Sequence, residues 1–482
     1  MNKKYYLLFV CLVSTLGGFL FGYDTAVISG TLTFVRAQFL MDSLLEGWFV
    51  GSALLGCVIG VSLTGIVADF FGRKKTLFLS AILLGLSAYG CMISGTLTTL
   101  IIFRLVGGIG VGIASMLSPL YISEISPPES RGRMVSLYQF AITIGILSAY
   151  LANSKLLSFG ELYSFHKESF FYFIFTDQVW RSMFGAETVP AILFFAFLFF
   201  VPESPRWLMT RNKQERATRV LLKFVDPKTA AREINDIKHV LAEESGDWRD
   251  IFRPGMRLAL FIGVSLAVLS QLTGINAIIY YGPKIFESAG FSTGGSLGGQ
   301  VIIGLINVLF TLIAIWKIDQ LGRRLLLLIG CAGMMVSHIA IGFLFFSGSS
   351  SGLLLLIFML SFIAFFAFSY GPVIWTLLSE IYPTNVRGRA MSIATFSLWT
   401  GTYVIGQMVP WMFENLQTFG TFWLFALMCI PALYIVFKLT PETKGKTLEE
   451  IERYWLERRR GNELVSGRNQ KANTNDTNFI HE

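Results

Sequence analysis

The stretch "SEISPPESRGRMVS" at residues 123–136 is repeated 256 residues later as "SEIYPTNVRGRAMS" at residues 379–392. The two copies share Ser-Glu-Ile, a proline, an entire Arg-Gly-Arg and the final serine. Conserved spacing of this kind within one chain indicates an internal duplication. The repeat therefore predicts two halves of the same architecture.

Two further pairs of motifs occur in the same order in both halves. "GIVADFFGRKK" (65–75) is echoed by "WKIDQLGRR" (316–324), and "PESPRW" (202–207) by "PETKGK" (441–446). Three ordered matches at similar offsets support the duplication. Two copies that run in the same direction form the parallel repeat typical of a large class of membrane transporters.

The composition indicates a membrane protein. The 482 residues are 53% hydrophobic and 15% charged, with 44 Phe and a mean hydropathy of +0.60. A membrane-spanning helix needs about 20 predominantly apolar residues. Twelve runs of that kind are found at 6–30, 47–70, 76–97, 98–122, 135–155, 184–201, 257–290, 298–318, 325–347, 353–380, 390–412 and 418–438. The predicted fold class is an all-α membrane protein with twelve transmembrane helices in two pseudo-symmetric six-helix halves.

The net charge of +8 reflects orientation in the membrane rather than nucleic-acid binding. The basic clusters "GRKK", "RGR", "GRR" and "RGR" all fall on one side of a twelve-span chain, and positive loops face the cytoplasm. Both termini are then predicted to be cytoplasmic. The N-terminal "MNKKYYLLFVCLV" has no small-residue cleavage site after it and continues into a full span, so we predict a first helix rather than a signal peptide.

The duplication also predicts domain boundaries. The N-terminal half is expected at 1–201, a polar helical linker domain at 202–256, the C-terminal half at 257–440 and a cytoplasmic tail at 441–482. The tail beyond about 456 is polar and rich in Asn, which is typical of a disordered segment. The five cysteines lie within apolar runs without metal-type spacing, so they are predicted to pack in the structure.

Together these motifs resemble the sugar porter family of the major facilitator superfamily over essentially the whole chain. Within the family, "FGYDTAVISGT" and "GGIGVGIASMLSPLYISE", with a long external loop at 155–182, are most similar to bacterial D-xylose:proton symporters. The resemblance implies a monomeric transporter of the bacterial cytoplasmic (inner) membrane that imports a monosaccharide by alternating access. The histidines His166, His239, His338 and His481 are scattered and no nucleophile motif appears, so we expect no enzymatic activity, no cofactor, no metal and no nucleic-acid partner.

Two charged residues lie deep in the apolar runs of the N-terminal half. Asp24 precedes the expected outer end of helix 1, near Gly30, by six residues, and Arg104 follows the expected outer start of helix 4, near Thr98, by six. At 1.5 Å per residue each is roughly 9 Å below the surface, so the two can pair. A static buried ion pair and a proton-coupling site both explain them. Burial disfavours a charged carboxylate and a close Arg favours it, so a change in their separation would hold or release a proton. The resemblance implies that Asp24 carries the proton.

A sugar site needs side chains that donate and accept hydrogen bonds, with an aromatic platform for the ring. In "SQLTGINAIIYYGP", Gly274 and Pro283 permit a local break that would bring Gln271 and Asn276 into one cavity. Interhelical hydrogen bonding or packing is the alternative for each residue. The resemblance implies substrate-binding or gating roles for Phe21, Gln139, Gln271, Asn276, Tyr280, Tyr281, Asn307, Trp375 and Trp399.

Two positions depart from the family pattern. Ser270 stands where the family often has a second Gln, and Leu398 stands before Trp399 where the D-xylose symporters have an amide. Both changes remove long hydrogen-bonding groups, so the sequence leaves the identity of the sugar open.

The repeated motifs also place acids and bases together at the cytoplasmic helix ends. Orientation explains the arginines but not the acids, so we predict a gate of inter-half ion pairs and helix-end contacts that closes the cytoplasmic side. The predicted gate residues are Asp69, Arg73, Glu124, Arg131, Arg133, Glu203, Asp319, Arg323, Glu380, Arg387, Arg389 and Glu442.

The sequence thus favours a proton-coupled monosaccharide symporter. A proton-independent facilitator is the nearest alternative, and Asp24 with Arg104 argues against it. A transporter-like sugar sensor is a second alternative, and the short cytoplasmic tail argues against that. "GGIGVG" at 107–112 lies inside a predicted membrane helix without a preceding strand, so it predicts close helix packing rather than nucleotide binding.

Overall fold

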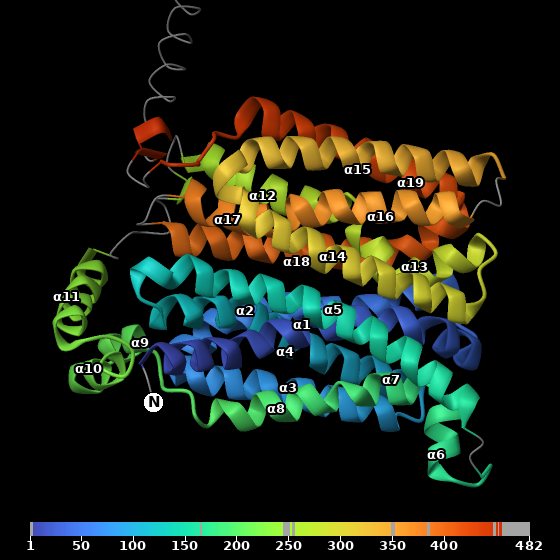
Figure 1. Ribbon diagram of the computed structural model, residues 1–482, viewed down its shortest axis with the longest axis horizontal. Coiled ribbons are helices and arrows are strands. Elements are labelled where there is room, and N and C mark those ends of the chain that lie inside the picture. Colours follow the sequence, from blue (N-terminus) through green and yellow to red (C-terminus); the bar gives the residue numbers. More distant parts are fainter. Residues whose placement is uncertain are drawn as a thin grey trace, which may run out of the picture.

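The computed structural model describes residues 3–163, 166–243, 251–252, 256–348, 352–382, 386–446, 450–451 and 453–455. These residues form a bundle of long helices in two groups, stacked one above the other in Figure 1. The predicted disorder of the tail beyond 456 concerns residues outside this description. The all-helical fold class and the division into two groups of helices agree with the prediction.

Six crossings make up the N-terminal half. The sixth crossing is divided between α7 and α8, and two short elements, α6 and η1, connect it to the fifth. The bounds are α1 (Lys3–Phe39), α2 (Ser43–Phe71), α3 (Arg73–Ile93), α4 (Leu97–Ile125), α5 (Pro128–Leu162), α6 (Phe170–Tyr172), η1 (Phe173–Asp177), α7 (Trp180–Ala186) and α8 (Thr188–Leu198).

The C-terminal half repeats this arrangement with two interrupted crossings. Its first crossing is divided between α12 and α13, and its fourth between α16 and α17. The bounds are α12 (Met256–Leu272), α13 (Ile275–Ser288), α14 (Thr293–Leu321), α15 (Arg323–Phe346), α16 (Gly352–Phe368), α17 (Tyr370–Ile381), α18 (Arg387–Asn415), α19 (Gln417–Tyr434) and η3 (Ile435–Leu439).

Eleven helical segments of the described chain are long and apolar enough to cross a membrane. The twelfth crossing is α18, which is 29 residues long but carries Gln407, Glu414 and several Ser, Thr and Gly residues. It packs against α2 of the other half and against α12, in the middle of the bundle (Figure 1). A helix shielded by its neighbours can hold more polar residues than one that faces lipid.

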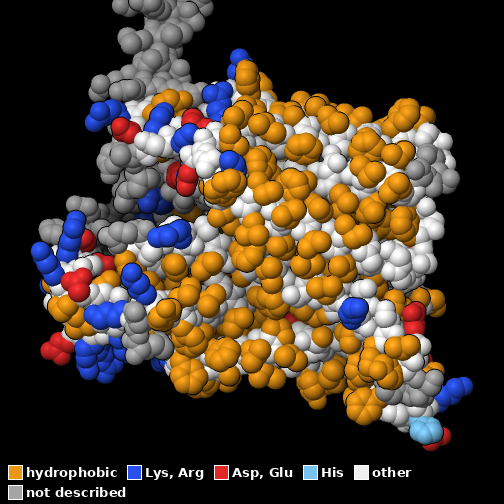
Figure 2. Space-filling view, in the orientation of Figure 1, with side chains coloured by type: hydrophobic (Ala, Val, Ile, Leu, Met, Phe, Trp, Pro, Cys, Tyr) orange, Lys and Arg blue, Asp and Glu red, His pale blue; other side chains and the backbone are white. Residues whose placement is uncertain are grey.

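Three short helices, α9 (Pro205–Thr210), α10 (Gln214–Leu221) and α11 (Pro227–Glu243), lie between the halves in sequence. They share a small core of Leu208, Ala217, Leu221 and Ile234. We call the end of the bundle that carries them the linker end and the opposite end the distal end. Hydrophobic side chains cover the flank of the bundle, whereas most of the charged side chains in view gather at the linker end (Figure 2).

Two predicted boundaries were wrong. Helix α1 continues nine residues past Gly30 because its polar residues find partners: Thr31 bonds the Ile28 carbonyl at 3.0 Å, and Gln38 accepts from Trp180 Nε1 at 2.8 Å. The predicted loop at 155–182 is also largely helical, because α5 extends to Leu162 and α6, η1 and the start of α7 follow.

The glycines of "GGIGVG" allow α4 to lie directly against α2. A methyl group at Gly108 would come within 1.9 Å of the Ala53 carbonyl oxygen, and one at Gly112 within 2.4 Å of the Cys57 carbonyl oxygen. Backbones that approach this closely exclude any side chain. The predicted role of this motif in helix packing is confirmed.

We therefore expect Gly108→Ala to separate α2 from α4 and to cost about 1–3 kcal/mol of stability through overpacking. Gly65→Ala on α2 is the matched control, because a methyl group there meets nothing within 4 Å. Thermal unfolding of the purified protein in detergent checks both. Equal melting temperatures for the two variants would contradict the close-packing account.

Candidate functional site

Asp24 and Arg104 form a buried ion pair inside the N-terminal half. Arg104 Nη1 donates to Asp24 Oδ1 at 2.9 Å, and the side chains are only 3% and 7% exposed, respectively. The Phe184 ring of α7 lies 5.6 Å from the guanidinium carbon of Arg104. The pairing inferred from the sequence is present, although α1 ends far beyond Gly30. Its role in proton coupling stays a prediction.

A second buried carboxylate near this pair was missed at the sequence level. Glu187 sits at the junction of α7 and α8, is 2% exposed, and interacts electrostatically with both Asp24 and Arg104. Its Oε1 has no hydrogen-bond partner among the described residues. The sequence does single it out, because Glu187 is the only charged residue within the apolar run predicted at 184–201. Its neighbourhood holds two acids and one base, which is a suitable arrangement for holding a proton.

The first crossing of the C-terminal half breaks where the sequence predicted. Gly274 separates α12 from α13 with φ +87°, a left-handed conformation that favours glycine. Asn276 Nδ2 then donates to Gln271 Oε1 at 2.7 Å. Pro283 takes no part in the break, since it lies inside α13.

Neighbouring hydroxyls complete this amide cluster. Gln271 Nε2 donates to Ser270 Oγ at 2.9 Å, and Thr402 of α18 donates to Gln271 Oε1 at 3.1 Å. Gln271 is partly exposed, whereas Asn276 is 6% exposed. The cluster therefore offers both donors and acceptors at one place. Ser270, which departs from the family pattern, contributes its hydroxyl to the same network.

Aromatic rings from the two halves meet at Trp399, three residues before Thr402 on α18. The Phe21 ring of α1 and the Trp399 ring of α18 lie 5.2 Å apart. Trp399 is 2% exposed, and its Nε1 has no partner in the part of the chain that the structure describes. Tyr281 joins α13 to α18, because its hydroxyl donates to the Gly406 carbonyl at 2.7 Å.

The remaining predicted ligands lie on three other helices. Gln139 of α5 and Trp375 of α17 are partly exposed, Asn307 of α14 is 7% exposed and Tyr280 of α13 is 2% exposed. No hydrogen bond joins these four side chains to Gln271 or Asn276. Their assignment to the sugar site stays a prediction.

At the linker end, the charged residues of the N-terminal half bind one another. Arg73 bonds Glu124 at 3.1 Å and Asp69 at 3.0 Å. Glu203 Oε1 accepts the backbone N–H groups of Arg73 and Lys74 at 2.9 and 3.1 Å and so caps α3. Burial raises the pKa of Glu203, although these hydrogen bonds oppose the shift.

The C-terminal half repeats this arrangement residue for residue. Arg323 bonds Glu380 at 2.8 Å and Asp319 at 2.9 Å, and Glu442 accepts the backbone N–H groups of Arg323 and Arg324, both at 3.0 Å. The ion pairs of Arg73 and Arg323 thus lie within their own halves. The expectation that they join the halves was wrong, because each copy of the motif supplies its own partners.

The other predicted gate residues lie near the N-terminal ends of α5 and α18. Arg131 Nη2 donates to the Ser126 carbonyl at 3.4 Å, and Arg387 Nε donates to the Tyr382 carbonyl at 3.3 Å. Arg133 is exposed and Arg389 partly buried.

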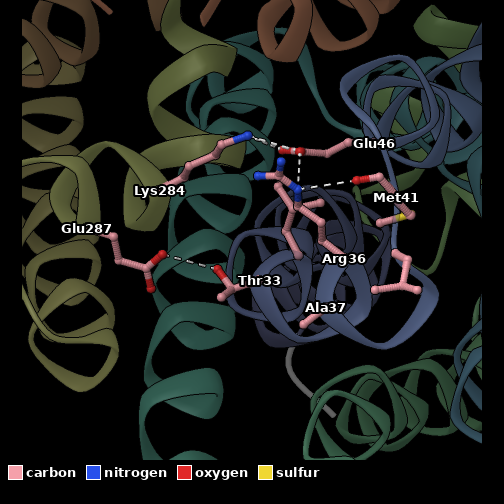
Figure 3. A pocket seen from close by; sticks show the side chains of 9 residues that line it. Thr33, Arg36, Ala37, Met41, Glu46, Lys284 and Glu287 are labelled. Atoms are coloured by element: carbon pink, nitrogen blue, oxygen red, sulfur yellow. Dashed lines mark hydrogen bonds and ion pairs between the residues drawn. The ribbon is translucent and has the colours of Figure 1, made fainter. Parts of the chain in front are cut away.

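The distal end holds an ion cluster that joins the two halves. Glu46 at the start of α2 is fully buried, and it bonds Lys284 of α13 at 2.7 Å and Arg36 of α1 at 3.3 Å. Figure 3 shows Lys284 reaching across to Glu46, with Thr33 and Glu287 in a second, longer contact of 3.5 Å. These residues line a pocket between the helix ends. Arg36 and Glu46 lie between the predicted apolar runs at 6–30 and 47–70, whereas Lys284 lies inside the run at 257–290, six residues from its end, and was overlooked.

Fold and site together define a membrane transporter built from two six-helix halves. A family model described as sugar (and other) transporter matches residues 10–455. The chain belongs to this family, the sugar porters of the major facilitator superfamily.

Two relatives and one solved structure illustrate the relationship. The arabinose-proton symporter of Bacillus subtilis (strain 168) is 40% identical over 93% of this chain and 95% of its own. The D-xylose-proton symporter of Escherichia coli (strain K12) is 39% identical over 94% of this chain and 97% of its own. A structure of the E. coli xylose transporter in a partially occluded inward-open conformation matches with a TM-score of 0.79 at 37% identity, covering 92% of this chain and all of that one.

The distal cluster predicts that Lys284→Met favours separation of the distal ends. The change leaves the buried Glu46 with Arg36 alone, which shifts the balance by about 2 kcal/mol toward the open distal end. Spin labels on cysteines introduced at the exposed Leu44 and Asn415 would report longer distances.

Thr33→Val is the matched control for this experiment, since it removes only the 3.5 Å contact to Glu287 across the same boundary. We expect it to keep the wild-type distance distribution. If Lys284→Met did the same, the ion cluster would have no part in closing the distal end.

Proposed function

We propose that the protein is a proton-coupled symporter that imports a monosaccharide by alternating access. The observation that carries this proposal is the ion pair of Asp24 and Arg104, buried in one half of a sugar transporter fold. An ionisable pair in this position is costly to insert and is seldom kept for packing alone. The relatives named as sugar-proton symporters support the same reading.

Proton coupling would follow from the separation of Asp24 and Arg104. With Arg104 at 2.9 Å, the carboxylate is stabilised without its proton. A helix movement that withdraws Arg104 leaves a desolvated carboxylate, which takes a proton. Glu187 can receive the released guanidinium, because it is buried nearby with an unpaired oxygen. The proton then stays on Asp24 until the pair forms again.

The sugar would bind between the halves at the amide cluster. Asn276 Nδ2 donates to Gln271 Oε1 at 2.7 Å. The sugar hydroxyls can replace this bond, because a hydroxyl both accepts from a donor and donates to an acceptor. Trp399 Nε1 supplies a further donor, and the Phe21 ring meets the apolar face of the sugar. The other predicted ligands Gln139, Tyr280, Asn307 and Trp375 would complete the wall of the site.

The cargo we propose is a pentose, either D-xylose or L-arabinose. The two relatives are named as symporters of arabinose and of D-xylose, and both sugars are smaller than a hexose. Ser270 bonds Gln271 and has no amide group to present to the cavity, and Leu398 has no hydrogen-bonding group. A site with fewer hydrogen-bonding groups suits a ring with fewer hydroxyls.

The sidedness follows from charge. Most of the charged side chains in view gather at the linker end (Figure 2), so this end would face the cytoplasm, with both termini on that side and the distal end outside a bacterial inner membrane. The charge clusters at the linker end would brace the helix ends within each half while the halves rock about the central site. A single chain holds both halves and the site, so a monomer suffices. The proposed domains remain 1–201, 202–256, 257–440 and 441–482.

Asp24→Asn tests the coupling. The variant keeps the shape of the side chain but cannot hold or release a proton, so uphill uptake should be lost while sugar binding and exchange persist. With a pH-sensitive dye in the external medium, proteoliposomes would show sugar-induced alkalinisation of that medium for the wild type and none for the variant. Normal accumulation by Asp24→Asn would remove the coupling role, and uptake by the wild type without alkalinisation would indicate a facilitator.

Trp399→Phe tests the sugar site. Because its Nε1 has no partner among the described residues, the change should leave the melting temperature unaltered and weaken binding of D-xylose or L-arabinose about tenfold. Tyr281→Phe is the matched control, since it removes a hydroxyl bonded to the Gly406 carbonyl and should lower stability but not affinity. If Trp399→Phe kept the wild-type affinity and Tyr281→Phe lowered it, the sugar would bind elsewhere.

A further inference from the structure

The break between α12 and α13 leaves backbone groups without their usual helical partners. Gly274 N–H donates to the Gln271 carbonyl at 3.1 Å, and the Ser270 carbonyl accepts from Thr273 Oγ1 at 2.8 Å. Ala277 N–H donates to the Gly274 carbonyl at 3.1 Å, although in a continuous helix it would bond the Thr273 carbonyl. The Thr273 carbonyl therefore needs another donor.

His338 of α15 supplies that donor. Its Nε2 lies 2.8 Å from the Thr273 carbonyl oxygen, and because a carbonyl only accepts, Nε2 carries the hydrogen. The other ring nitrogen, Nδ1, has no partner among the described residues, so the imidazole acts as a single donor. A buried carbonyl in a membrane protein is costly to leave unpaired, and this contact satisfies it.

Three aromatic rings fix the position of the imidazole. Phe362 of α16 lies 4.3 Å from the imidazole between ring centroids, and Phe422 and Phe425 of α19 lie at 5.6 and 5.7 Å. Phe425 also occupies the space beside Gly274, where a methyl group would meet it at 2.6 Å. The histidine and the break are therefore held by the same cage.

We propose that His338 is a positioning residue for the sugar site. Thr273 lies two residues after Gln271 and three before Asn276, so the carbonyl that His338 holds is the fixed point between the two amides. His338 is itself 0% exposed, which keeps it from any ligand in the cavity. It acts through the backbone, from a helix that carries none of the predicted sugar ligands. This inference rests on the proposed function, because it concerns the same site.

Removing the donor while keeping the ring tests the proposal. In His338→Phe the Thr273 carbonyl loses its partner, the break relaxes, and Gln271 and Asn276 lose their shared geometry. We expect the dissociation constant for L-arabinose or D-xylose to rise about tenfold, with a parallel rise in the KM of uptake and a Vmax close to wild type. Titration calorimetry on the purified full-length protein and uptake into proteoliposomes measure these values.

Two amide variants distinguish the effect of the N–H position from the effect of side-chain size. His338→Gln places an N–H where Nε2 lies and should restore affinity to within about twofold of wild type. His338→Asn places its amide near the position of Nδ1, out of reach of Thr273, and should behave like His338→Phe. If the Phe variant does not fold, the Gln and Asn variants, which are similar in polarity, still decide the question. Equal affinities for Gln and Asn would overturn the proposal.

A control on a neighbouring helix separates this effect from general loosening. Trp423→Phe removes a side-chain N–H that bonds the Ile339 carbonyl of α15 at 3.4 Å, one residue along from His338. It should leave sugar affinity unchanged. If His338→Phe lowers the melting temperature but leaves sugar affinity unchanged, its role is structural and the proposal fails.

The wild-type measurement identifies which proposal has failed. If the wild type binds neither pentose, the proposed cargo fails and this inference fails with it. If the wild type binds one of them and His338→Phe binds it equally well, only the positioning role of His338 is overturned.

Discussion

In the hydrocarbon of a bilayer every backbone N–H and C=O has to find a partner, usually within its own helix, and this constraint shapes the whole structure. Interrupted crossings are therefore informative. The described chain has them at Gly274, at Ser369 between α16 and α17, and at Glu187 between α7 and α8. Each lies close in sequence or in space to a candidate functional group. The interruption at Gly274 separates the two amides, and the one at Glu187 places a carboxylate near the ion pair of Asp24 and Arg104.

The two halves share the same charged contacts at the linker end but carry different polar side chains in the middle of the bundle. At the linker end the repeated motif makes matching contacts in both halves, with an arginine held by two acids and a third acid capping a helix. In the middle of the bundle, the N-terminal half carries the ion pair of Asp24 and Arg104, whereas the C-terminal half carries the amides Gln271 and Asn276. In the proposed function, proton chemistry and sugar recognition are thus divided between the halves. Only contacts across the boundary, such as Phe21 with Trp399, can couple them.

Much of this could be predicted from the sequence because the bilayer and the duplication both leave strong patterns. Twelve apolar runs gave the crossings, and the break at Gly274 followed from a glycine flanked by two amides. The end of α1 could not be predicted, because Thr31 and Gln38 look like the end of a span until their partners on the same helix and on α7 are known. Glu187 was overlooked as a single acid in an apolar run. His338 is one of four histidines in the chain, and nothing in the sequence reveals that it faces Thr273.

The ion pairs also differ in a way that matches their proposed roles. The pairs of Arg73 and Arg323 stay within one half, so rocking of the halves does not require them to break. The contact between Glu46 and Lys284 crosses the boundary, and its lysine side chain is 27% exposed. Water at that lysine lowers the free-energy cost of separating the charges, whereas a fully buried pair would hold the halves together too firmly to cycle. A contact that has to form and break in each cycle is therefore best placed at the rim, and the buried contacts are best kept inside each half.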